Sequence, residues 1–418
     1  MAAMLARRQD GRVAVPPPER LFARVASLPA GAPLIGRLQH VAGPPNVYLV
    51  GGAVRDLLLG GEPFDLDLVV EGDAAELAAG LGGELRAYDR FGTSTVTVNG
   101  FIYDVATARR ERYARPGALP DVTPATLVDD LTRRDFTVNA IAIALTGPRA
   151  GTVSSAPHAL ADLSARRLRV LHDRSFLDDP TRMLRMARYA SRLGFAIEPH
   201  TAALVRPDAL STVSGARVGA ELRLLAREPD PVAAFICLRE FGLDRAIAPR
   251  FGLRDPSAAR RALALLPRDG RRDRLVLSAA ATDIPAGQLA RRLDHLAFER
   301  VDREVIVAAA TRARAVAAAL AVATRPSEIA AAVDHAGPEL VALAGALGPA
   351  DPARVWLDRL RRVTLEISGE DLLAAGVPPG PAIGAGLRAA LAAKLDGRAA
   401  GAQAELSEAL AAARAITR

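Results

Sequence analysis

The sequence predicts an α/β head followed by a long all-α region. Short apolar strands alternate with helical stretches between residues 47 and 145, whereas few strand signals follow residue 175. From residue 229 to residue 418 the apolar positions recur with helical spacing, and proline and glycine punctuate the segments. Aromatic residues make up only 4% of the chain, and alanine, leucine and arginine dominate, which also favours helix.

The head is expected to mix strands and helices in a fixed order. Asn99-Gly100 is a strong turn dipeptide between two apolar runs, so it predicts a hairpin. The expected elements are a strand at 47–50, a helix at 53–59, a strand at 64–70, a helix at 73–81, hairpin strands at 93–98 and 101–105, a basic loop at 109–124, and an apolar run at 136–145 that fits either helix or strand. Along the whole chain we predict an N-terminal extension at 1–45, a catalytic head at 46–150, a helical neck at 151–228, and a helical body and tail at 229–418.

The bulk properties limit the classes of function. The formal charge is +7 and the sequence pI is about 10.3, which suits a polyanionic partner, although an arginine-rich composition explains the charge equally well. Cys237 is the single cysteine, so no intramolecular disulfide forms, and a cytoplasmic setting fits. The most apolar stretch, 305–324, is interrupted by Arg312 and Arg314, so we predict no membrane span.

A glycine pair marks the junction between the first strand and the first helix of the head. In Gly51-Gly52-Ala-Val-Arg55, the absence of side chains lets backbone N–H groups approach phosphate oxygens, and the helix N-terminus favours negative charge. Arg55 lies one turn into the helix, where it is expected to reach the same phosphates. A tight turn chosen only for its backbone angles gives the same pattern, so the pair alone is weak.

Two aspartates on the next strand supply the acidic part of the pattern. Asp65 and Asp67 are two residues apart, so they share one face of the strand while Phe64, Leu66 and Leu68 lie on the other. Paired carboxylates on a rigid strand are ligands that suit Mg²⁺. Two metal ions about 3.5–4 Å apart would clamp both oxygens of a phosphoryl transfer. Two solvated aspartates on an edge strand are the alternative.

The glycine turn, the basic helix and the Asp-x-Asp strand together resemble the nucleotidyltransferase superfamily that includes DNA polymerase β. That resemblance implies a third carboxylate on a later strand, and Asp104 is its best match. The string Arg133-Arg134-Asp135-Phe-Thr-Val-Asn139-Ala narrows the resemblance to the class II branch, the bacterial CCA-adding enzymes and poly(A) polymerases. The family then implies that Arg134 contacts the incoming nucleotide, and that Asp135 and Asn139 shape the motif or contact the ribose.

A second long string strengthens this resemblance. In Asp178-Asp179-Pro-Thr-Arg182, the family motif implies that Asp179 and Arg182 select the base through its exocyclic amine and adjacent ring acceptor, so that C and A are accepted and U and G refused. Arg185 and Arg188 continue the same stripe and are expected near the triphosphate. An ordinary solvated basic face is the alternative. The family often has Glu-Asp where this chain has Asp178-Asp179.

The resemblance covers about residues 47–225 and implies a polymerase-β-type head with a helical neck, body and tail. It implies an enzyme that uses ATP and CTP, tRNA and Mg²⁺, with Asp65 and Asp67 as the metal ligands. Full CCA addition and A-only addition both remain open, with poly(A) synthesis as a further alternative. Addition of C alone is disfavoured because the loop at 109–124, shortened in CC-adding members, is largely intact here.

Three alternative functions compete with this interpretation. A non-catalytic RNA-binding protein on a transferase scaffold would be expected to lose the aspartates or the glycine pair, and both are present. Transfer of a nucleotide to a small molecule or protein would not need the basic stripe and the long helical tail. His172-Asp173 resembles the dipeptide of a phosphohydrolase domain, but the other five histidines are scattered, so a second hydrolytic site is not expected.

Overall fold

The computed structural model describes residues 15–41, 46–88 and 92–417. The chain forms two compact units, Met1–Ser214 and Gly215–Arg418. Their boundary lies inside the predicted neck, 151–228, and the division into four regions stays a prediction.

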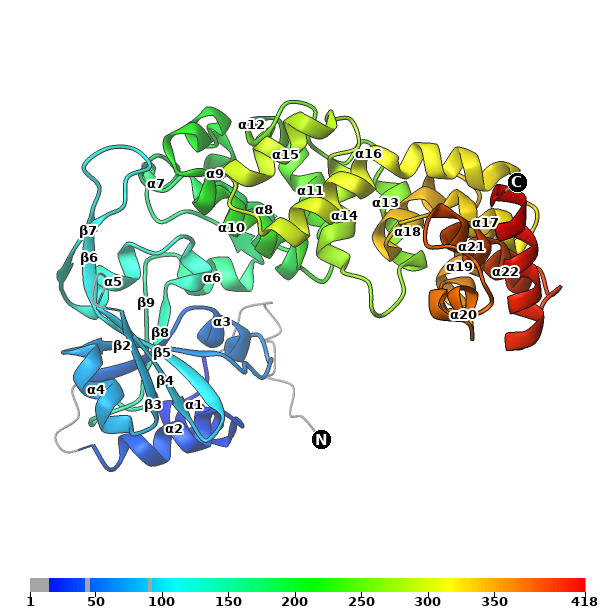
Figure 1. The fold of residues 1–418 in the computed structure, drawn as a ribbon. Coiled ribbons are helices and arrows are strands. Elements are labelled where there is room, and N and C mark those ends of the chain that lie inside the picture. Colours follow the sequence, from blue (N-terminus) through cyan, green and yellow to red (C-terminus); the bar gives the residue numbers. More distant parts are fainter. Residues whose placement is uncertain (1–14, 42–45, 89–91, 418) are drawn as a thin grey trace. The chain divides into compact units, whose positions relative to one another are not determined.

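The first unit is built on a seven-stranded mixed sheet with the order β3-β4-β5-β2-β1-β8-β9 (Figure 1). Strands β2 and β5 pair in parallel, and the other neighbours pair antiparallel. The strands are β1 (Asn46–Val50), β2 (Leu66–Glu71), β3 (Glu84–Tyr88), β4 (Thr93–Val98), β5 (Phe101–Thr107), β8 (Ile141–Ala144) and β9 (Val153–Ser155), with a separate hairpin of β6 (Arg109–Arg112) and β7 (Asp121–Pro124) and a short pair of β10 (Arg167–Leu168) and β11 (Ala196–Ile197).

Most of the predicted head elements are confirmed, with three corrections. The predicted hairpin has its turn at Asn99 and Gly100. Their φ angles of 52° and 82° are those of the turn expected there. The prediction of a loop over the whole of 109–124 is wrong, because the two ends of this segment pair as strands β6 and β7. Strand β3 was not predicted, because its sequence ELRAY lacks a clear apolar alternation. The ambiguous run 136–145 divides into a 3₁₀ turn, η2 (Thr137–Asn139), and strand β8.

The helices of the first unit cover the two faces of the sheet unequally (Figure 1). Helices α1, α2 and α4 lie on the face of Leu66, Leu68 and Tyr103, and the Tyr103 hydroxyl donates to the carbonyl of Ala30 at 2.6 Å. The first-unit helices are α1 (Pro18–Ser27), α2 (Gly31–Leu38), α3 (Gly52–Leu58), α4 (Ala74–Leu81), α5 (Leu127–Thr132), α6 (Ala159–Ser164), α7 (Ser175–Asp178), α8 (Thr181–Leu193), α9 (Pro199–Ala203) and the 3₁₀ turn η3 (Pro207–Thr212).

The opposite face of the sheet is only partly covered. There Val69 packs with Leu127 and Leu131 of α5 and with alanines of β8 in one apolar cluster. Asp67 lies two residues before Val69, on the same face, and is exposed. The uncovered part of this face is therefore where the acidic side chains reach solvent.

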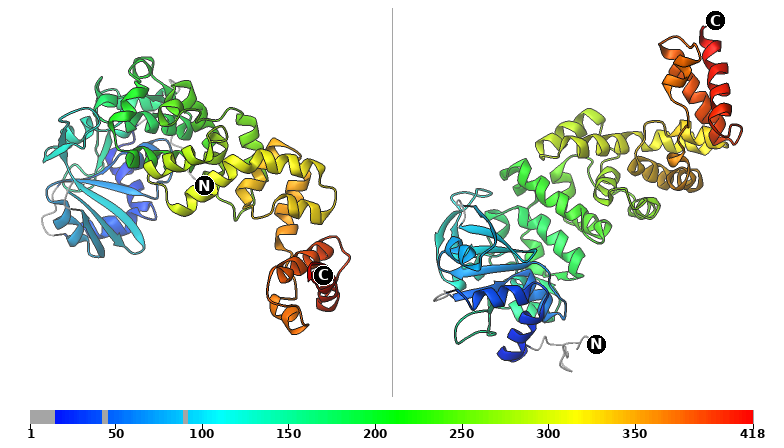
Figure 2. Two further views of the ribbon diagram at one scale, coloured as in Figure 1. Left: turned by 45° about the horizontal axis from the view of Figure 1, so that its top comes forward. Right: turned by 60° about the horizontal axis from the view of Figure 1, so that its bottom comes forward.

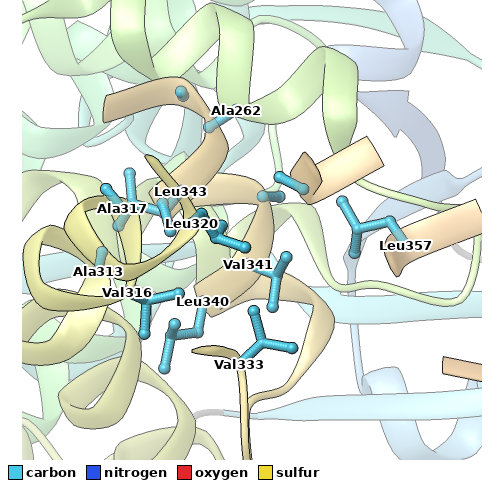
Figure 3. Close-up of a cluster of buried hydrophobic side chains, with 14 of the residues drawn as sticks. Ala262, Ala313, Val316, Ala317, Leu320, Val333, Leu340, Val341, Leu343 and Leu357 are labelled. Atoms are coloured by element: carbon cyan, nitrogen blue, oxygen red, sulfur yellow. The ribbon is translucent and has the colours of Figure 1, made fainter. Parts of the chain in front are cut away.

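The second unit consists of helices that follow one another along the chain, from green to red in Figure 2. They are α10 (Gly215–Ala226), α11 (Pro231–Glu240), α12 (Leu243–Ile247), α13 (Pro256–Leu265), α14 (Arg272–Ala280), α15 (Ala286–His295), α16 (Arg300–Val322), α17 (Pro326–Ala332), α18 (Pro338–Leu347), α19 (Ala350–Asp358), η4 (Leu360–Arg362), α20 (Gly369–Ala374), α21 (Pro381–Leu395) and α22 (Ala402–Thr417). Leucine, valine and alanine from α16 and α18 form its main core (Figure 3), and a smaller cluster joins α20, α21 and α22.

Helix α16 is long and apolar enough to cross a membrane by length and composition. A core helix of a globular protein has the same properties, and Ala313, Val316 and Leu320 of α16 pack in the cluster of Figure 3. Arg312 donates to the carbonyl of Asp334 at 2.9 Å, and Arg314 pairs with Asp283 at 2.8 Å. This helix is therefore used in the helical core, and the absence of a membrane span stays a prediction.

Candidate active site

Three carboxylates meet on the uncovered face of the sheet. Strands β2 and β5 run in parallel with Asp67 directly opposite Asp104, and Asp65 precedes β2 by one residue. All three residues are exposed. The Asp104 carboxylate accepts a 2.6 Å hydrogen bond from the Thr95 hydroxyl on β4, which orients it. Strand register thus brings the predicted third carboxylate beside the Asp-x-Asp pair.

The electrostatics of this group fit a cation. Partial desolvation raises the pKa of the Asp67 carboxyl, the negative charge of Asp104 raises it further, and Asp65 adds to the effect. Arg134 acts in the opposite direction and lowers the same pKa. Closely spaced carboxylates of this kind are hard oxygen ligands that suit Mg²⁺. Among residues 15–41, 46–88 and 92–417, however, no three acidic, histidine or cysteine side chains already stand in metal-binding geometry.

The glycine turn before α3 depends on Gly51. Its backbone has φ 74° and ψ −133°, a conformation that favours glycine, and it serves as the N-cap of α3. A Cβ atom at this position would lie 3.0 Å from Nη1 of Arg134, so the turn also makes room for that guanidinium. At Gly52 the same atom would meet only ordinary contacts, at 3.5 Å from Arg55. The turn therefore places backbone N–H groups and Arg134 together.

Arg134 is held by a buried carboxylate on α5. Asp130 is fully buried and accepts from Arg134 at 2.9 Å and from Arg133 at 2.6 Å. Burial opposes ionisation of Asp130, but the two arginines outweigh it and hold its pKa below the ordinary value. Arg133 also reaches Glu111 of β6 at 2.8 Å. The consecutive arginines thus leave α5 in fixed directions, with Arg134 aimed toward the glycine turn.

Arg55 points inward rather than toward solvent. Its side chain is 2% exposed and donates to both carboxylate oxygens of Asp56, at 2.8 and 3.0 Å, and to the side-chain oxygen of Asn139 at 2.6 Å. In this structure its hydrogen bonds join α3 to the Asn139 turn, and its contact with the phosphates stays a prediction.

Asn139 connects Arg55 to the second string. Its amide nitrogen donates to Asp135 at 3.0 Å, and Asp135 in turn accepts from Arg185 of α8 at 2.6 and 2.9 Å. Burial opposes ionisation of Asp135, but the charge of Arg185 and the hydrogen bonds lower its pKa to about 2. Asp135 and Asn139 therefore hold the shape of the motif, which is one of the two roles expected for them.

The basic stripe of α8 is mostly not a solvated face. Arg182 is 5% exposed and donates to the Ser175 hydroxyl at 2.8 Å and to the Arg133 carbonyl at 2.7 Å, whereas Arg188 is 7% exposed. Arg185 is half-buried against Asp135, and only Arg192 at the end of the stripe is exposed. Asp179 is the C-cap of α7 and accepts from the Thr181 backbone and hydroxyl at 3.0 and 2.6 Å. The alternative of a solvated charged stripe is thus wrong for Arg182 and Arg188.

Several residues of this region were missed by the sequence analysis. Tyr189 of α8 lies against the guanidinium groups of Arg55, Arg185 and Arg188, and Phe136 meets it edge-on. The Glu111 carboxylate accepts hydrogen bonds from Arg109, Arg133 and the Tyr113 hydroxyl. A single tyrosine among arginines or a glutamate in a basic hairpin carries no local signal, because its partners come from distant segments.

The discounted His172-Asp173 pair lies outside this group. Asp173 pairs with the exposed His200 at 2.8 Å, which raises the pKa of that imidazole. Desolvation lowers the pKa of His172. In the part of the chain that the structure describes, neither residue belongs to a group of three acidic, histidine or cysteine side chains in metal-binding geometry.

Comparison with known proteins decides the family. A family model described as the poly A polymerase head domain matches residues 47–169. The CC-adding tRNA nucleotidyltransferase of Deinococcus radiodurans is 35% identical over 391 residues, which is 90% of this chain and 91% of the relative. The chain belongs to the class II tRNA nucleotidyltransferase family. The family predicted from the motifs is thereby confirmed.

Other members of the family match with different coverage. The A-adding tRNA nucleotidyltransferase of Halalkalibacterium halodurans is 42% identical over 213 residues, which is 48% of this chain and 50% of the relative. The chain thus spans only about half the length of that relative. A solved structure of a CCA-adding enzyme, apo form II, matches with a TM-score of 0.79 at 28% sequence identity. The match covers 95% of this chain and 96% of the chain in that structure. The Thermotoga maritima CCA-adding enzyme complexed with tRNA matches with a TM-score of 0.73 at 26% sequence identity, over 94% of this chain and 98% of the chain in that structure. These matches confirm the predicted head followed by helices.

Proposed function

We propose that this protein transfers CMP, AMP or both from CTP and ATP to the 3′-hydroxyl of tRNA and releases pyrophosphate. The observation that carries the proposal is the convergence of Asp67 and Asp104 in paired strands with Arg134 and the glycine turn. Carboxylates beside a cationic phosphate cradle are what a nucleotidyl transfer requires. The tRNA substrate and the buried, lone Cys237 suit a cytoplasmic protein.

Asp65, Asp67 and Asp104 are the residues that would hold divalent cations, with Asp65 and Asp67 as the shared ligands. Magnesium bound there would lower the pKa of the attacking hydroxyl and neutralise the triphosphate. The elevated pKa of Asp67 supports this assignment, because a cation would relieve the repulsion that raises it. Thr95 keeps Asp104 oriented through its hydroxyl.

The remaining residues would bind and orient the nucleotide. The backbone N–H group of Gly52, at the N-terminus of α3, would receive a phosphate oxygen, whereas that of Gly51 donates to the Ile141 carbonyl at 3.0 Å. Arg134 would neutralise the charge of the phosphates. Asp179 and Arg182 would read the base edge. Both terminal nitrogens of Arg182 already donate one hydrogen bond each, but each carries a second N–H, so the existing bonds aim the guanidinium without exhausting it. Arg55, Arg185 and Arg188 act by positioning these groups.

The second unit offers a surface for the RNA backbone. Three adjoining hollows of about 650, 370 and 300 Å³ lie among α11 to α16. The buried Nε of Arg292 has no hydrogen-bond partner among the described residues, and desolvation lowers the pKa of its guanidinium. Basic hollows of this kind suit phosphate groups recognised by charge and shape. Their charged lining consists of Arg239, Arg245, Arg250, Arg254, Arg291, Arg292, Arg314 and His295, against Asp244 and Asp283.

The test is incorporation of labelled nucleotides into three tRNA transcripts that end before CCA, after C, or after CC. Each transcript receives CTP, ATP or both, with an Asp65→Ala, Asp67→Ala double variant as the control. Completion of the first transcript means full CCA addition, and a single A on the third alone means A-only addition. Two C residues without A would match the activity named for the Deinococcus relative and would overturn the expectation drawn from the intact 109–124 segment. No magnesium-dependent incorporation into any transcript would contradict the proposal.

Poly(A) synthesis is the second candidate, favoured by the description of the family model that matches the head. It would add long A tracts to any of the three transcripts. Product length on a sequencing gel separates it from single-nucleotide addition.

A further inference from the structure

We propose that Tyr189 is a positioning residue that couples the phosphate-binding turn to the base-selecting helix, and that its aromatic ring rather than its hydroxyl does so. The inference rests on the proposed function. Tyr189 lies on α8, seven residues after Arg182 and ten after Asp179, so it is not one of the residues assigned to the base.

Three segments that are distant in sequence meet at this ring. Arg55, from the helix that follows the glycine turn, has its guanidinium carbon 5.6 Å from the ring centroid. Arg185 and Arg188, from α8 itself, lie at 5.5 and 4.7 Å. Phe136, from the second string, packs edge-on with the centroids 5.9 Å apart and the planes at 82°. The helix that follows the glycine turn, the string that contains Phe136, and α8 itself therefore all contact Tyr189.

The hydrogen bonds around the ring form one continuous path. Asp56 holds Arg55, Arg55 donates to Asn139, Asn139 donates to Asp135, and Asp135 accepts from Arg185. Three of these side chains, Arg55, Asn139 and Asp135, are nearly fully buried, so the path has little freedom to rearrange. Tyr189 contacts the guanidinium groups at both ends of the segment from Arg55 to Arg185.

The chemistry of the ring explains why an aliphatic side chain would not replace it. Guanidinium groups repel one another, and the negative face of an aromatic ring attracts each of them when it lies within about 6 Å. Among the described residues, the Tyr189 hydroxyl accepts one hydrogen bond, a long one of 3.3 Å from Arg185. The ring should therefore matter more than the hydroxyl.

The consequence for function concerns selectivity. The base edge is read by Asp179 and Arg182 at the start of α8, and the triphosphate is held at the glycine turn, so discrimination requires a constant distance between the two. A small displacement of either group costs about 10²-fold in rate for the correct substrate and little for a wrong one that never fits. Loss of the ring should therefore lower the preference for C and A over U, beyond any loss of stability.

The experiment compares Tyr189→Phe and Tyr189→Leu in the full-length protein. Incorporation of CTP, ATP and UTP into the tRNA transcripts is measured as kcat/KM, normalised to the folded fraction. We expect Tyr189→Phe to keep the ratio of correct to incorrect incorporation within about 2-fold, because the ring remains. For Tyr189→Leu we expect the ratio to fall about 10-fold or more. Phe235→Leu, in the core of the second unit, is the matched control and should lower Tm without changing the ratio.

Two results would overturn the proposal. One is a Tyr189→Leu protein with reduced Tm and an unchanged ratio, which would make the residue merely structural. The other is an equal loss in Tyr189→Phe, which would assign the role to the hydroxyl. If Tyr189→Leu does not fold, Tyr189→Met replaces it, since a flexible thioether fills the volume without a strong quadrupole.

The same proteins separate this inference from the proposed function. Affinities for ATP and UTP, measured by ligand-induced shifts of Tm, give a second selectivity ratio that needs no RNA. A wild-type protein that binds ATP in preference to UTP but extends no tRNA would refute the proposed function, while the variants would still test Tyr189. A wild-type protein that binds neither nucleotide would overturn both.

Discussion

In the first unit the buried charges include arginines, whereas the buried charges described in the second unit are all acidic. Arg55 of α3 and Arg182 and Arg188 of α8 lie in one region with Asp130 and Asp135, and their hydrogen bonds cross between segments, as from Arg55 to Asn139 and from Arg182 to the Arg133 carbonyl. In the second unit, buried acids join neighbouring helices, as Asp302, Glu339 and Glu405 do.

Buried arginines and buried acids do different things in the two units. A buried arginine keeps its charge and directs its N–H groups along fixed lines, so a cluster of such residues defines a rigid frame. A buried glutamate such as Glu405 satisfies two backbone N–H groups and one lysine, and so fastens neighbouring helices. Substitution of a buried charged residue around the site should therefore lower activity, whereas substitution of a buried acid in the second unit should lower stability alone.

Among the residues that frame the site, the largest contrast is expected at glycine. Gly51→Ala places a Cβ atom against Arg134 in a backbone conformation that alanine rarely adopts, so activity should fall about 10²-fold. Gly36→Ala in α2 meets no atom within 4 Å and should leave activity unchanged while stabilising the helix by about 0.5–1 kcal/mol. Initial rates and Tm of both variants check this, and equal rates for the two would break the comparison.

Ion pairs should differ in the same way. Asp135→Asn removes a buried carboxylate from the half-buried Arg185, which should cost about 1–3 kcal/mol and about 10-fold in activity. Glu304→Gln removes a pair with Arg300 whose side chains are 55% and 81% exposed, and should change little. Calorimetric unfolding and initial rates of both proteins measure the difference.

The pH dependence of the Asp135 contribution follows from its depressed pKa of about 2. A carboxyl whose pKa is lower in the folded state stabilises that state above its unfolded value of about 3.9. This contribution should be complete at neutral pH and should be lost as the pH falls from about 4 toward 2. Asp135→Asn should therefore flatten the Tm profile in that window, and an unchanged profile would contradict the assignment.

A smaller effect is expected on RNA binding by the second unit. Arg292→Gln should weaken tRNA binding about 10-fold and reduce the salt dependence of log K by about one phosphate contact, with the KM for ATP unchanged. Arg300→Gln on α16 is the matched control and should leave affinity within about 2-fold. Fluorescence anisotropy at several salt concentrations gives both quantities, and equal effects of the two variants would refute the role of the hollow.

The smallest expected effect is a change in the melting temperature on substitution of Asp67. Because the pKa of Asp67 is raised in the folded protein, its charged form is disfavoured there, and Asp67→Asn should raise Tm by about 1–3 °C at neutral pH and low divalent ion. Magnesium should raise the Tm of the wild type and not that of the variant. A lower Tm for Asp67→Asn would show that the carboxylates do not repel one another.

Local patterns predicted the parts of the site that lie within one segment. The glycine turn, the Asp-x-Asp strand and the two long strings were visible because each is contiguous. Asp104 was harder, since only the β2–β5 register places it opposite Asp67. The position of Arg55 one turn into the helix predicts that it reaches the phosphates, but Asp56 and Asn139 hold its side chain inward.

The remainder depended on contacts that no local pattern records. The stripe on α8 has the spacing of a solvated face, and its burial follows from the Arg133 carbonyl and Asp135, some fifty residues earlier. The hairpin inside 109–124 was missed because alternating charged residues give no apolar signal. In the second unit, helical periodicity predicted the elements but not the hollows between them.

The most direct measurement is single-turnover incorporation of labelled nucleotide into tRNA, as a function of magnesium, by the wild type, Asp67→Asn and Asp73→Asn. Asp73 is the N-cap of α4, and asparagine serves that role equally well, so this variant is the matched control. We expect the wild type and Asp73→Asn to react alike, and Asp67→Asn to lose about 10³-fold or more at every magnesium concentration. An Asp67→Asn protein that reacts within about 10-fold of the wild type would show that the carboxylates of β2 and β5 are not the catalytic centre.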